Sequence, residues 1–153
     1  MTWAVVRIRG KVRRSAPVKD TLRMLRLTRQ NHCVIVPETP AFRGMVQKVK
    51  DFVTWGEVSP EVVAKLLLKR GGLTDAAVKG NSRFKSVWDF AQALAKGEAT
   101  VVDVKGLRPV LRLHPPRGGF VATKRPFADR GDLGYRGKEI NELLERMIFE
   151  EAA

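Results

Sequence analysis

Two hydrophobic periodicities, one typical of strands and one typical of helices, alternate along the first third of the chain. Residues 3–9 divide between two faces at strand period, an apolar one (Ala4, Val6 and Ile8) and a mixed one (Trp3, Val5, Arg7 and Arg9), which is typical of a half-buried strand. Short apolar runs at 33–36 and 52–58 predict two more strands. Between them, apolar residues recur every three or four positions over 18–28 and 39–50, which predicts two helices. The β-α-β-α-β order predicts an α+β fold, a two-layer ferredoxin-like sandwich with both helices on one face of a small sheet.

The second predicted helix begins with a capping signal. Thr39 offers an N-cap hydroxyl, and Pro40 occupies the first helical position, where its missing N–H costs nothing. One stripe of this helix is apolar and is expected to face a core. A parallel stripe of Arg43, Gln47 and Lys50 is left for solvent or an anionic partner.

From residue 59 onward the pattern becomes helical. Serines 59 and 86 are N-cap signals for two helices that end at glycines 71–72 and 97, with a basic loop between the helices. We therefore expect a helical insert over residues 59–106, added to a core that comprises residues 1–58.

The last third of the chain, residues 107–153, mixes three kinds of segment. Residues 107–113 predict an edge strand, 117–137 form a glycine-rich basic loop, and 138–151 predict a helix. That helix carries two basic and five acidic side chains, so we expect it to pack on the body with its glutamates in solvent. All three regions are expected to form one compact unit.

Charge narrows the class of partner. The 153 residues include 29 Lys and Arg against 16 Asp and Glu, a net charge of +13, with 44% hydrophobic residues. A folded protein this basic meets nucleic acid more often than an anionic membrane or an acidic protein. No apolar run approaches the roughly 20 residues that span a bilayer, and Arg7 and Arg9 interrupt any signal peptide, so neither membrane insertion nor export is expected.

Catalytic and metal-binding patterns are not found in the sequence. His32, His114 and the single Cys33 have no flanking carboxylates that would complete a zinc site, so we expect no metal and no cofactor. Cys33 lies in an apolar run and is interpreted as a small buried hydrophobe, consistent with a reducing cytoplasm. No nucleophile has a matching base, and no carboxylates are paired, so the protein is not expected to be an enzyme.

The first predicted helix carries a basic stripe. Lys19, Arg23 and Arg26 recur about one turn apart, with Asp20 alone to offset them. Solvated helix faces usually mix both signs of charge, so this stripe favours an anionic ligand over plain solvation.

Three further positions leave alternatives open. Gly44 costs about 1 kcal/mol of helix propensity against Ala, which close packing within the protein and close approach of an RNA backbone explain equally well. Trp3 and Trp55 could stack on bases, but at these strand positions aromatic residues are more often part of a core.

Several motifs resemble one known family. They are Val-Arg-Ile-Arg-Gly at 6–10, Thr-Leu-Arg-Met-Leu-Arg-Leu at 21–27, Thr-Pro-Ala-Phe-Arg-Gly-Met at 39–45 with Lys48-Val49, Pro-Pro-Arg-Gly-Gly-Phe at 115–120, Gly-Asp-Leu-Gly-Tyr-Arg at 131–136 and Ile-Asn-Glu-Leu-Leu-Glu-Arg-Met at 140–147. The first three closely resemble the ribosomal protein L-thirty family of the large subunit, whose eukaryotic member is numbered seven. The last three look like its longer archaeal and eukaryotic form. The resemblance covers nearly the whole chain and is weakest over 73–105.

The resemblance implies a structural, non-enzymatic component of the large ribosomal subunit in the cytoplasm of an archaeon. Such a protein binds and stabilises folded rRNA through phosphate and shape contacts. The resemblance also implies a position near 5S rRNA, neighbouring large-subunit proteins as partners, and a monomer within the ribosome.

Motif matching and charge together predict the RNA-binding residues. The motifs supply Arg23, Arg26, Arg29, Thr39, Arg43, Gly44 and Lys48. The N-terminal basic segment and the first helix add Arg7, Arg9, Lys11, Arg13, Arg14 and Lys19. The C-terminal loop adds Arg117, Lys124, Arg125 and Arg136.

Three other classes of function fit less well. A DNA-binding transcription factor would prefer a specific duplex, but no helix-turn-helix spacing is present. A nucleic-acid-processing enzyme would need a carboxylate cluster for magnesium. An RNA-recognition-motif domain has a related fold, but residues 52–58 lack its basic-aromatic signature.

Overall fold

The computed structural model describes residues 2–9, 16–70, 75–81, 83–100, 104, 110–116, 119–120 and 125–148. Its described strands form one sheet in the order β4-β2-β1-β3-β5. They are β1 (Thr2–Arg7), β2 (His32–Pro37), β3 (Val53–Glu57), β4 (Leu111–Arg112) and β5 (Gly134–Tyr135). β1 is antiparallel to both β2 and β3, β4 is antiparallel to β2, and β5 is parallel to β3. The predicted α+β class is confirmed.

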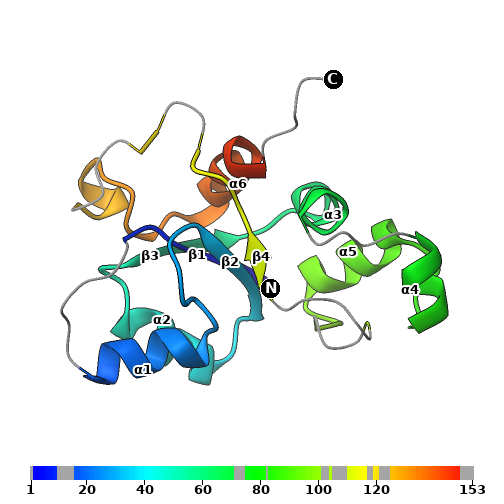
Figure 1. Cartoon of the computed structure of the whole chain (residues 1–153), viewed down its shortest axis with the longest axis horizontal. Coiled ribbons are helices and arrows are strands. Elements are labelled where there is room, and N and C mark those ends of the chain that lie inside the picture. The colour runs from blue at the N-terminus through cyan, green and yellow to red at the C-terminus, as the bar shows by residue number, and fades with distance from the viewer. Residues whose placement is uncertain are drawn as a thin grey trace.

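Two helices cover one face of this sheet, α1 (Ala16–Met24) and α2 (Pro40–Lys48). Trp3 and Val5 of β1 point to this face and pack in one buried cluster with Leu22 of α1 and Val46 of α2. Figure 1 shows both helices together on this side, as the short crossovers predicted.

The other face of the sheet is also covered. Ala4 and Val6 of β1 pack there against a larger buried cluster from three helices. The helices are α3 (Pro60–Lys69), α5 (Val87–Lys96) and α6 (Ile140–Ile148), and α4 (Asp75–Asn81) packs against α5 (Figure 1). The prediction of a half-buried first strand is therefore wrong, because every residue of β1 is buried. The half-buried prediction considered residues 1–58 alone, and the helices that cover this second face lie later in the chain.

Local signals account for the helix ends. The Thr39 hydroxyl accepts a hydrogen bond from the Phe42 N–H at 3.3 Å, and serines 59 and 86 cap α3 and α5 in the same way. Gly97 closes α5 in the left-handed conformation at φ 83°. Each of these predicted signals is confirmed, whereas glycines 71–72 lie outside the described residues.

The C-terminal third departs from the prediction in two places. Residues 134–135, predicted as loop, pair with β3, and residues 75–81, predicted as part of a basic loop region, form α4. The edge strand is shorter than predicted, at Leu111–Arg112, because residues 110 and 113 are described but are not part of the strand, and residues 105–109 lie outside the described ranges. The last helix packs as expected, with Leu143 and Met147 buried and Glu142 and Glu145 exposed. Within the described ranges, every helix falls short of the length and apolarity that a membrane crossing requires.

Candidate nucleic-acid interface

The outer surface of the α1/α2 layer gathers basic side chains. We call it the α1/α2 face and define it by Lys19, Arg23, Arg26, Arg43, Gly44 and Lys48, all of which are exposed. Among the described residues, the only ion pair that this face forms joins Arg43 Nη2 to Glu38 Oε1 at 2.5 Å, with the Arg43 side chain 60% exposed. The other four cations of the face have no acidic partner in the described part of the chain, so their charge is available to a ligand.

Arg26 holds an unusual backbone position. α1 ends at Met24 instead of continuing to residue 28 as predicted, because the chain closes it with a Schellman motif. The Leu27 N–H donates to the Leu22 carbonyl at 2.9 Å, and the Arg26 N–H donates to the Arg23 carbonyl at 2.9 Å. Arg26 itself lies in the left-handed region at φ 63°, where glycine is the usual residue. Residue 26 is therefore an arginine in a backbone conformation that glycine would adopt with less strain.

The N-terminal half of α2 offers a smooth surface next to Arg43. Apart from the backbone of its own helix, no described atom lies within 4 Å of the place that a Cβ would take at Gly44. Close packing within the protein is therefore not the reason for glycine here. Of the two explanations offered by the sequence, this leaves the close approach of a partner to be tested. Thr39, at the start of α2, is partly exposed, and its hydroxyl accepts the Phe42 cap hydrogen bond.

Arg7 is buried, in contrast to the exposed cations. It is 8% exposed, and its guanidinium donates to the carbonyls of Leu27 at 2.8 Å and Arg9 at 2.9 Å. Burial lowers the pKa of Arg7. Its guanidinium fastens the end of β1 to the turn after α1, so the geometry does not support it as an RNA contact.

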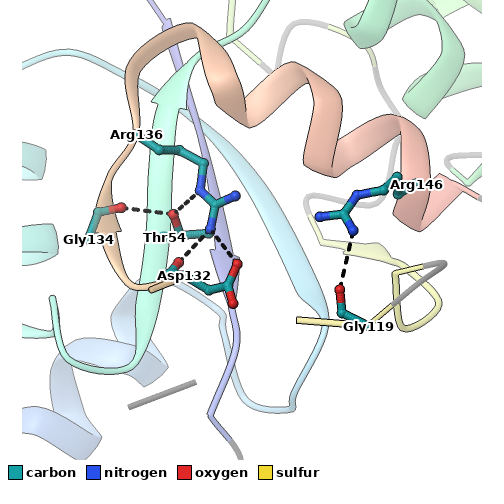
Figure 2. Close-up of polar contacts among 6 residues, drawn as sticks. All are labelled: Thr54, Gly119, Asp132, Gly134, Arg136 and Arg146. Atoms are coloured by element: carbon teal, nitrogen blue, oxygen red, sulfur yellow. Dashed lines mark hydrogen bonds and ion pairs between the residues drawn. The ribbon is translucent and has the colours of Figure 1, made fainter. Parts of the chain in front are cut away.

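Arg136 is also internal, and Figure 2 shows its surroundings. Its Nη2 donates to the Asp132 carbonyl at 2.6 Å and lies 3.3 Å from Asp132 Oδ1, while its Nε donates to Thr54 Oγ1 at 2.8 Å. Thr54 Oγ1 in turn donates to the Gly134 carbonyl at 2.8 Å. Burial lowers the pKa of Arg136, and the hydrogen bond and charge of Asp132 oppose that shift. The residue fixes its loop to β3 and is not exposed to a ligand.

The loop that Arg136 fixes presents two arginines on its outside. Arg125 and Arg130 are both exposed, and Arg130 takes the left-handed conformation at φ 57°. A Cβ at Gly131 would lie 2.0 Å from the Arg125 carbonyl oxygen, so a glycine is required for this tight return. Of the other predicted residues, Lys11, Arg13, Arg14, Arg117 and Lys124 lie outside the described residues.

Two predicted residues lie at the end of the sheet where β1 ends. Arg29 is exposed in the turn before β2. Arg9 is half-buried, with its guanidinium carbon 5.4 Å from the centre of the Phe52 ring. Neither belongs to the set of residues that defines the α1/α2 face.

The aromatic alternatives separate clearly. Trp3 and Trp55 are 6% and 3% exposed and lie in the core, with ring centres 6.3 Å apart. Tyr135 is exposed beside Trp55, and a hydrogen bond from its hydroxyl to Glu57 raises its pKa to about 12.

Burial raises the pKa of the Cys33 thiol to about 12 as well, so the interpretation of Cys33 as a buried hydrophobe is confirmed. No group of three or more potential metal ligands occurs among the described residues.

Comparison with known proteins identifies the family. The family "Ribosomal protein L30p/L7e" matches residues 3–53, a segment that contains both helices of the α1/α2 layer. The large ribosomal subunit protein uL30 of Methanoregula boonei is 51% identical over 152 residues, covering 95% of this chain and 99% of the relative. Proteins of the same name from Methanopyrus kandleri and Archaeoglobus fulgidus are 49% and 46% identical, covering 92% and 95% of this chain and 100% and 99% of the relatives. The chain belongs to the uL30 family.

Membership of the uL30 family confirms the resemblance that the motifs indicated, including its archaeal form. Proteins of the uL30 family are structural and are not enzymes, as the sequence analysis expected.

Sequence reasoning missed two exposed arginines in this uL30 chain. Arg112 lies on β4 directly opposite His32 of β2, and Arg130 lies at the tip of the fixed loop. The strand predicted at 107–113 could have indicated Arg112, because alternation places it on the opposite face from the buried Leu111 and Leu113. No local pattern indicated the conformation of Arg130.

Proposed function

We propose that this protein is a structural component of the large ribosomal subunit and binds folded rRNA with its α1/α2 face through phosphate and shape contacts. Membership of the uL30 family and the names of its relatives support the ribosomal role. The observation that carries the RNA-binding face is the set of exposed cations on α1 and α2 that have no acidic partner among the described residues.

The chemistry of this face suits a phosphate backbone. Each Arg or Lys that meets a phosphate releases condensed counterions, so several modest contacts add up to an affinity that falls steeply with salt. Backbone contacts fix position without reading sequence. Gly44 supports a shape contact in addition, because its exposed, unencumbered Cα lets a sugar-phosphate backbone approach α2 closely.

The proposed contact set follows from exposure. It keeps the predicted residues Arg9, Lys19, Arg23, Arg26, Arg29, Thr39, Arg43, Gly44, Lys48 and Arg125. Arg7 and Arg136 are removed from it, because their guanidinium groups are buried and bonded within the protein. The predicted position near 5S rRNA, contacts with neighbouring large-subunit proteins and a cytoplasmic monomer within the ribosome belong to the same proposal.

The three sequence regions are proposed to act as one unit in this role. β4 and β5 from region 107–153 pair with β2 and β3 of region 1–58. In the insert, the Leu94 carbonyl accepts a hydrogen bond from the Thr2 hydroxyl of β1. These links support one rigid body that presents the α1/α2 face.

The salt dependence of binding tests the proposal. Replacing Arg23, Arg26 and Arg43 together by Gln removes three phosphate contacts, so the slope of log K against log salt for binding to large-subunit rRNA should become shallower by about 2 to 3. Filter binding at several salt concentrations, with duplex DNA as competitor, measures this slope.

A matched triple variant serves as the control. Lys65, Lys79 and Lys96 are exposed cations on α3, α4 and α5, and their replacement by Gln removes the same charge from the other side of the molecule. The control variant should keep the slope of the unaltered protein. An unchanged slope in the Arg23/Arg26/Arg43 variant, or equal changes in both variants, would contradict the assigned face.

A further inference from the structure

A second basic cluster lies at one end of the sheet, outside the α1/α2 face. His32 of β2 and Arg112 of β4 are direct partners across the two antiparallel strands. Arg29 lies in the turn before β2, and its carbonyl accepts the His32 N–H at 3.4 Å. Arg29 and Arg112 are exposed, and His32 is half-buried between them. Three cationic or ionisable side chains from separate segments thus meet at one place.

The cluster has no acidic compensation among the described residues. Burial lowers the pKa of His32, and the charges of Arg112, Arg29 and Arg7 lower it further. These arginines come from three different places in the chain: β4, the turn before β2, and β1. The contrast with Arg136 is direct, since that buried guanidinium has the Asp132 carboxylate 3.3 Å away.

His32 also has an unused polar atom. Its Nδ1 is buried and has no hydrogen-bond partner in the described part of the chain. Arg7 cannot turn toward the cluster, because its Nη1 and Nε donate to the carbonyls of Leu27 and Arg9. The site therefore combines the His32 imidazole and the exposed Arg29 and Arg112 side chains with the positive charge of Arg7, which is held within the protein.

We propose that Arg29, His32 and Arg112 form a binding site for a phosphate group, supplied either by an RNA backbone or by free inorganic phosphate. Guanidinium groups bind phosphate oxygens through paired N–H donors, and two of them flank the imidazole. A bound phosphate supplies the negative charge that the cluster lacks. Arg29 also belongs to the proposed rRNA contact set, whereas His32 and Arg112 do not. The site is testable with inorganic phosphate in the absence of any rRNA, so the inference does not require the proposed rRNA partner.

Binding of phosphate at this site is linked to a proton. An anion beside the imidazole favours its charged form, so phosphate should raise the pKa of His32, and lower pH should tighten binding. The chain has only two histidines, His32 and His114, so their ring protons are readily assigned in a proton NMR spectrum with the help of a His114→Gln variant.

The experiment follows the two histidine titrations by NMR in a low-salt buffer without phosphate, then with added sodium phosphate, and separately with a short RNA oligonucleotide that lacks terminal phosphates. The pKa of His32 should rise by about one unit in at least one arm. A rise with the oligonucleotide identifies a phosphodiester as the ligand, and a rise with inorganic phosphate alone identifies the free anion. No rise in either arm, or the same rise at His114, would overturn the proposal.

Variants separate this site from general electrostatics. Arg112→Gln removes a neighbouring positive charge, so the pKa of His32 without phosphate should rise, whereas the further rise on adding phosphate should be lost. Arg112→Lys should keep part of the phosphate response. Lys79→Gln, an equal loss of charge at an exposed position on α4, should leave the response intact. A full phosphate response in Arg112→Gln would also overturn the site. Because the Arg23/Arg26/Arg43 variant should retain the His32 response, failure here and failure of the rRNA proposal are distinguishable.

Discussion

The two helical layers that cover the sheet use their charged side chains differently. Between residues 16 and 50, which build the α1/α2 layer, the chain has seven basic and two acidic side chains. Most of these cations are exposed. In the layer of α3, α5 and α6, Lys65 pairs with Glu145 at 3.5 Å, and Arg70 donates to the Ile148 carbonyl at 2.9 and 2.6 Å. Arg146 likewise donates to the Gly119 carbonyl (Figure 2).

The buried apolar clusters beneath the two layers also differ in size. The larger buried cluster lies between the sheet and the α3/α5/α6 layer, and the smaller one lies under α1 and α2. The α3/α5/α6 layer therefore packs on most of the core, and its arginines Arg70 and Arg146 donate to carbonyls within the protein. The cations of the α1/α2 layer are exposed, and we propose that they meet a partner. On this view, the location of a cation in the fold, more than its presence, decides whether it stabilises the protein or binds a ligand.

The strongest test of this contrast is the removal of a buried cation. Arg136→Met leaves the buried Asp132 carboxylate without its guanidinium, which should lower the free energy of unfolding by about 3–5 kcal/mol. Arg43→Met breaks an exposed pair and should change it by less than about 1 kcal/mol. Urea denaturation measures both. The variant Arg136→Met/Asp132→Leu should recover much of the loss. Equal effects of Arg136→Met and Arg43→Met would erase the distinction between the two cations.

Gly44→Ala should separate stability from binding. Alanine has the better helix propensity and meets no described atom at this position, so the variant should be about 1 kcal/mol more stable. If a nucleic-acid backbone approaches Gly44, the added methyl group should weaken rRNA binding. Gly80→Ala, at an equally open position on α4, is the matched control and should not change affinity. Thermal unfolding and filter binding give the two readings, and unchanged rRNA affinity in Gly44→Ala would remove Gly44 from the contact set.

Arg26→Gly, at the end of α1, should also raise stability while weakening rRNA binding. Glycine relieves the left-handed conformation but adds freedom to the unfolded chain, so the net gain in stability should be about 0.5–1 kcal/mol. The lost charge should weaken rRNA binding and reduce its salt slope by roughly one contact. Arg26→Lys keeps both the strain and the charge, and should resemble the unaltered protein. Undiminished affinity in Arg26→Gly would mean that the strained arginine serves no contact.

The smallest effect is expected on the opposite layer. Lys65 and Glu145 form an exposed pair, with both side chains 52% exposed, so Glu145→Gln should change the free energy of unfolding by about 0–1 kcal/mol. It should also leave rRNA affinity unchanged, because α6 lies on the other side of the sheet from the α1/α2 face. Tighter rRNA binding after this loss of an acidic group would extend the interface to α6.

Much of the fold was predictable because its signals are local. The caps at Thr39 and Ser86 and the apolar stripes of α2 and α6 depend on residues a few positions apart. The cover on the second face of β1 was not predictable in this way, because it requires the insert and the C-terminal helix to return to the sheet.

The sequence identified the candidate binding residues by their charge but did not show which of them are exposed. Arg136 and Arg125 look alike in the sequence, but Thr54, which lies 82 positions before Arg136, makes Arg136 internal. The meeting of His32 with Arg112 depends on the pairing of β2 with β4, which no short stretch encodes. Arg26 was assigned to a helix because the Schellman motif that ends α1 lacks its usual glycine.

The position of β1 also orders the assembly of the molecule. β1 lies at the middle of the sheet, is buried on both faces, and precedes in the chain every element that packs on it. During synthesis it therefore emerges first and has neither of its flanking strands until residues 32–57 follow. Its first partners, β2 and β3, are close in sequence, so a three-stranded centre can pair early, while β5 must await the far end of the chain. The order of synthesis would thus allow this sheet to form from its centre toward its edges.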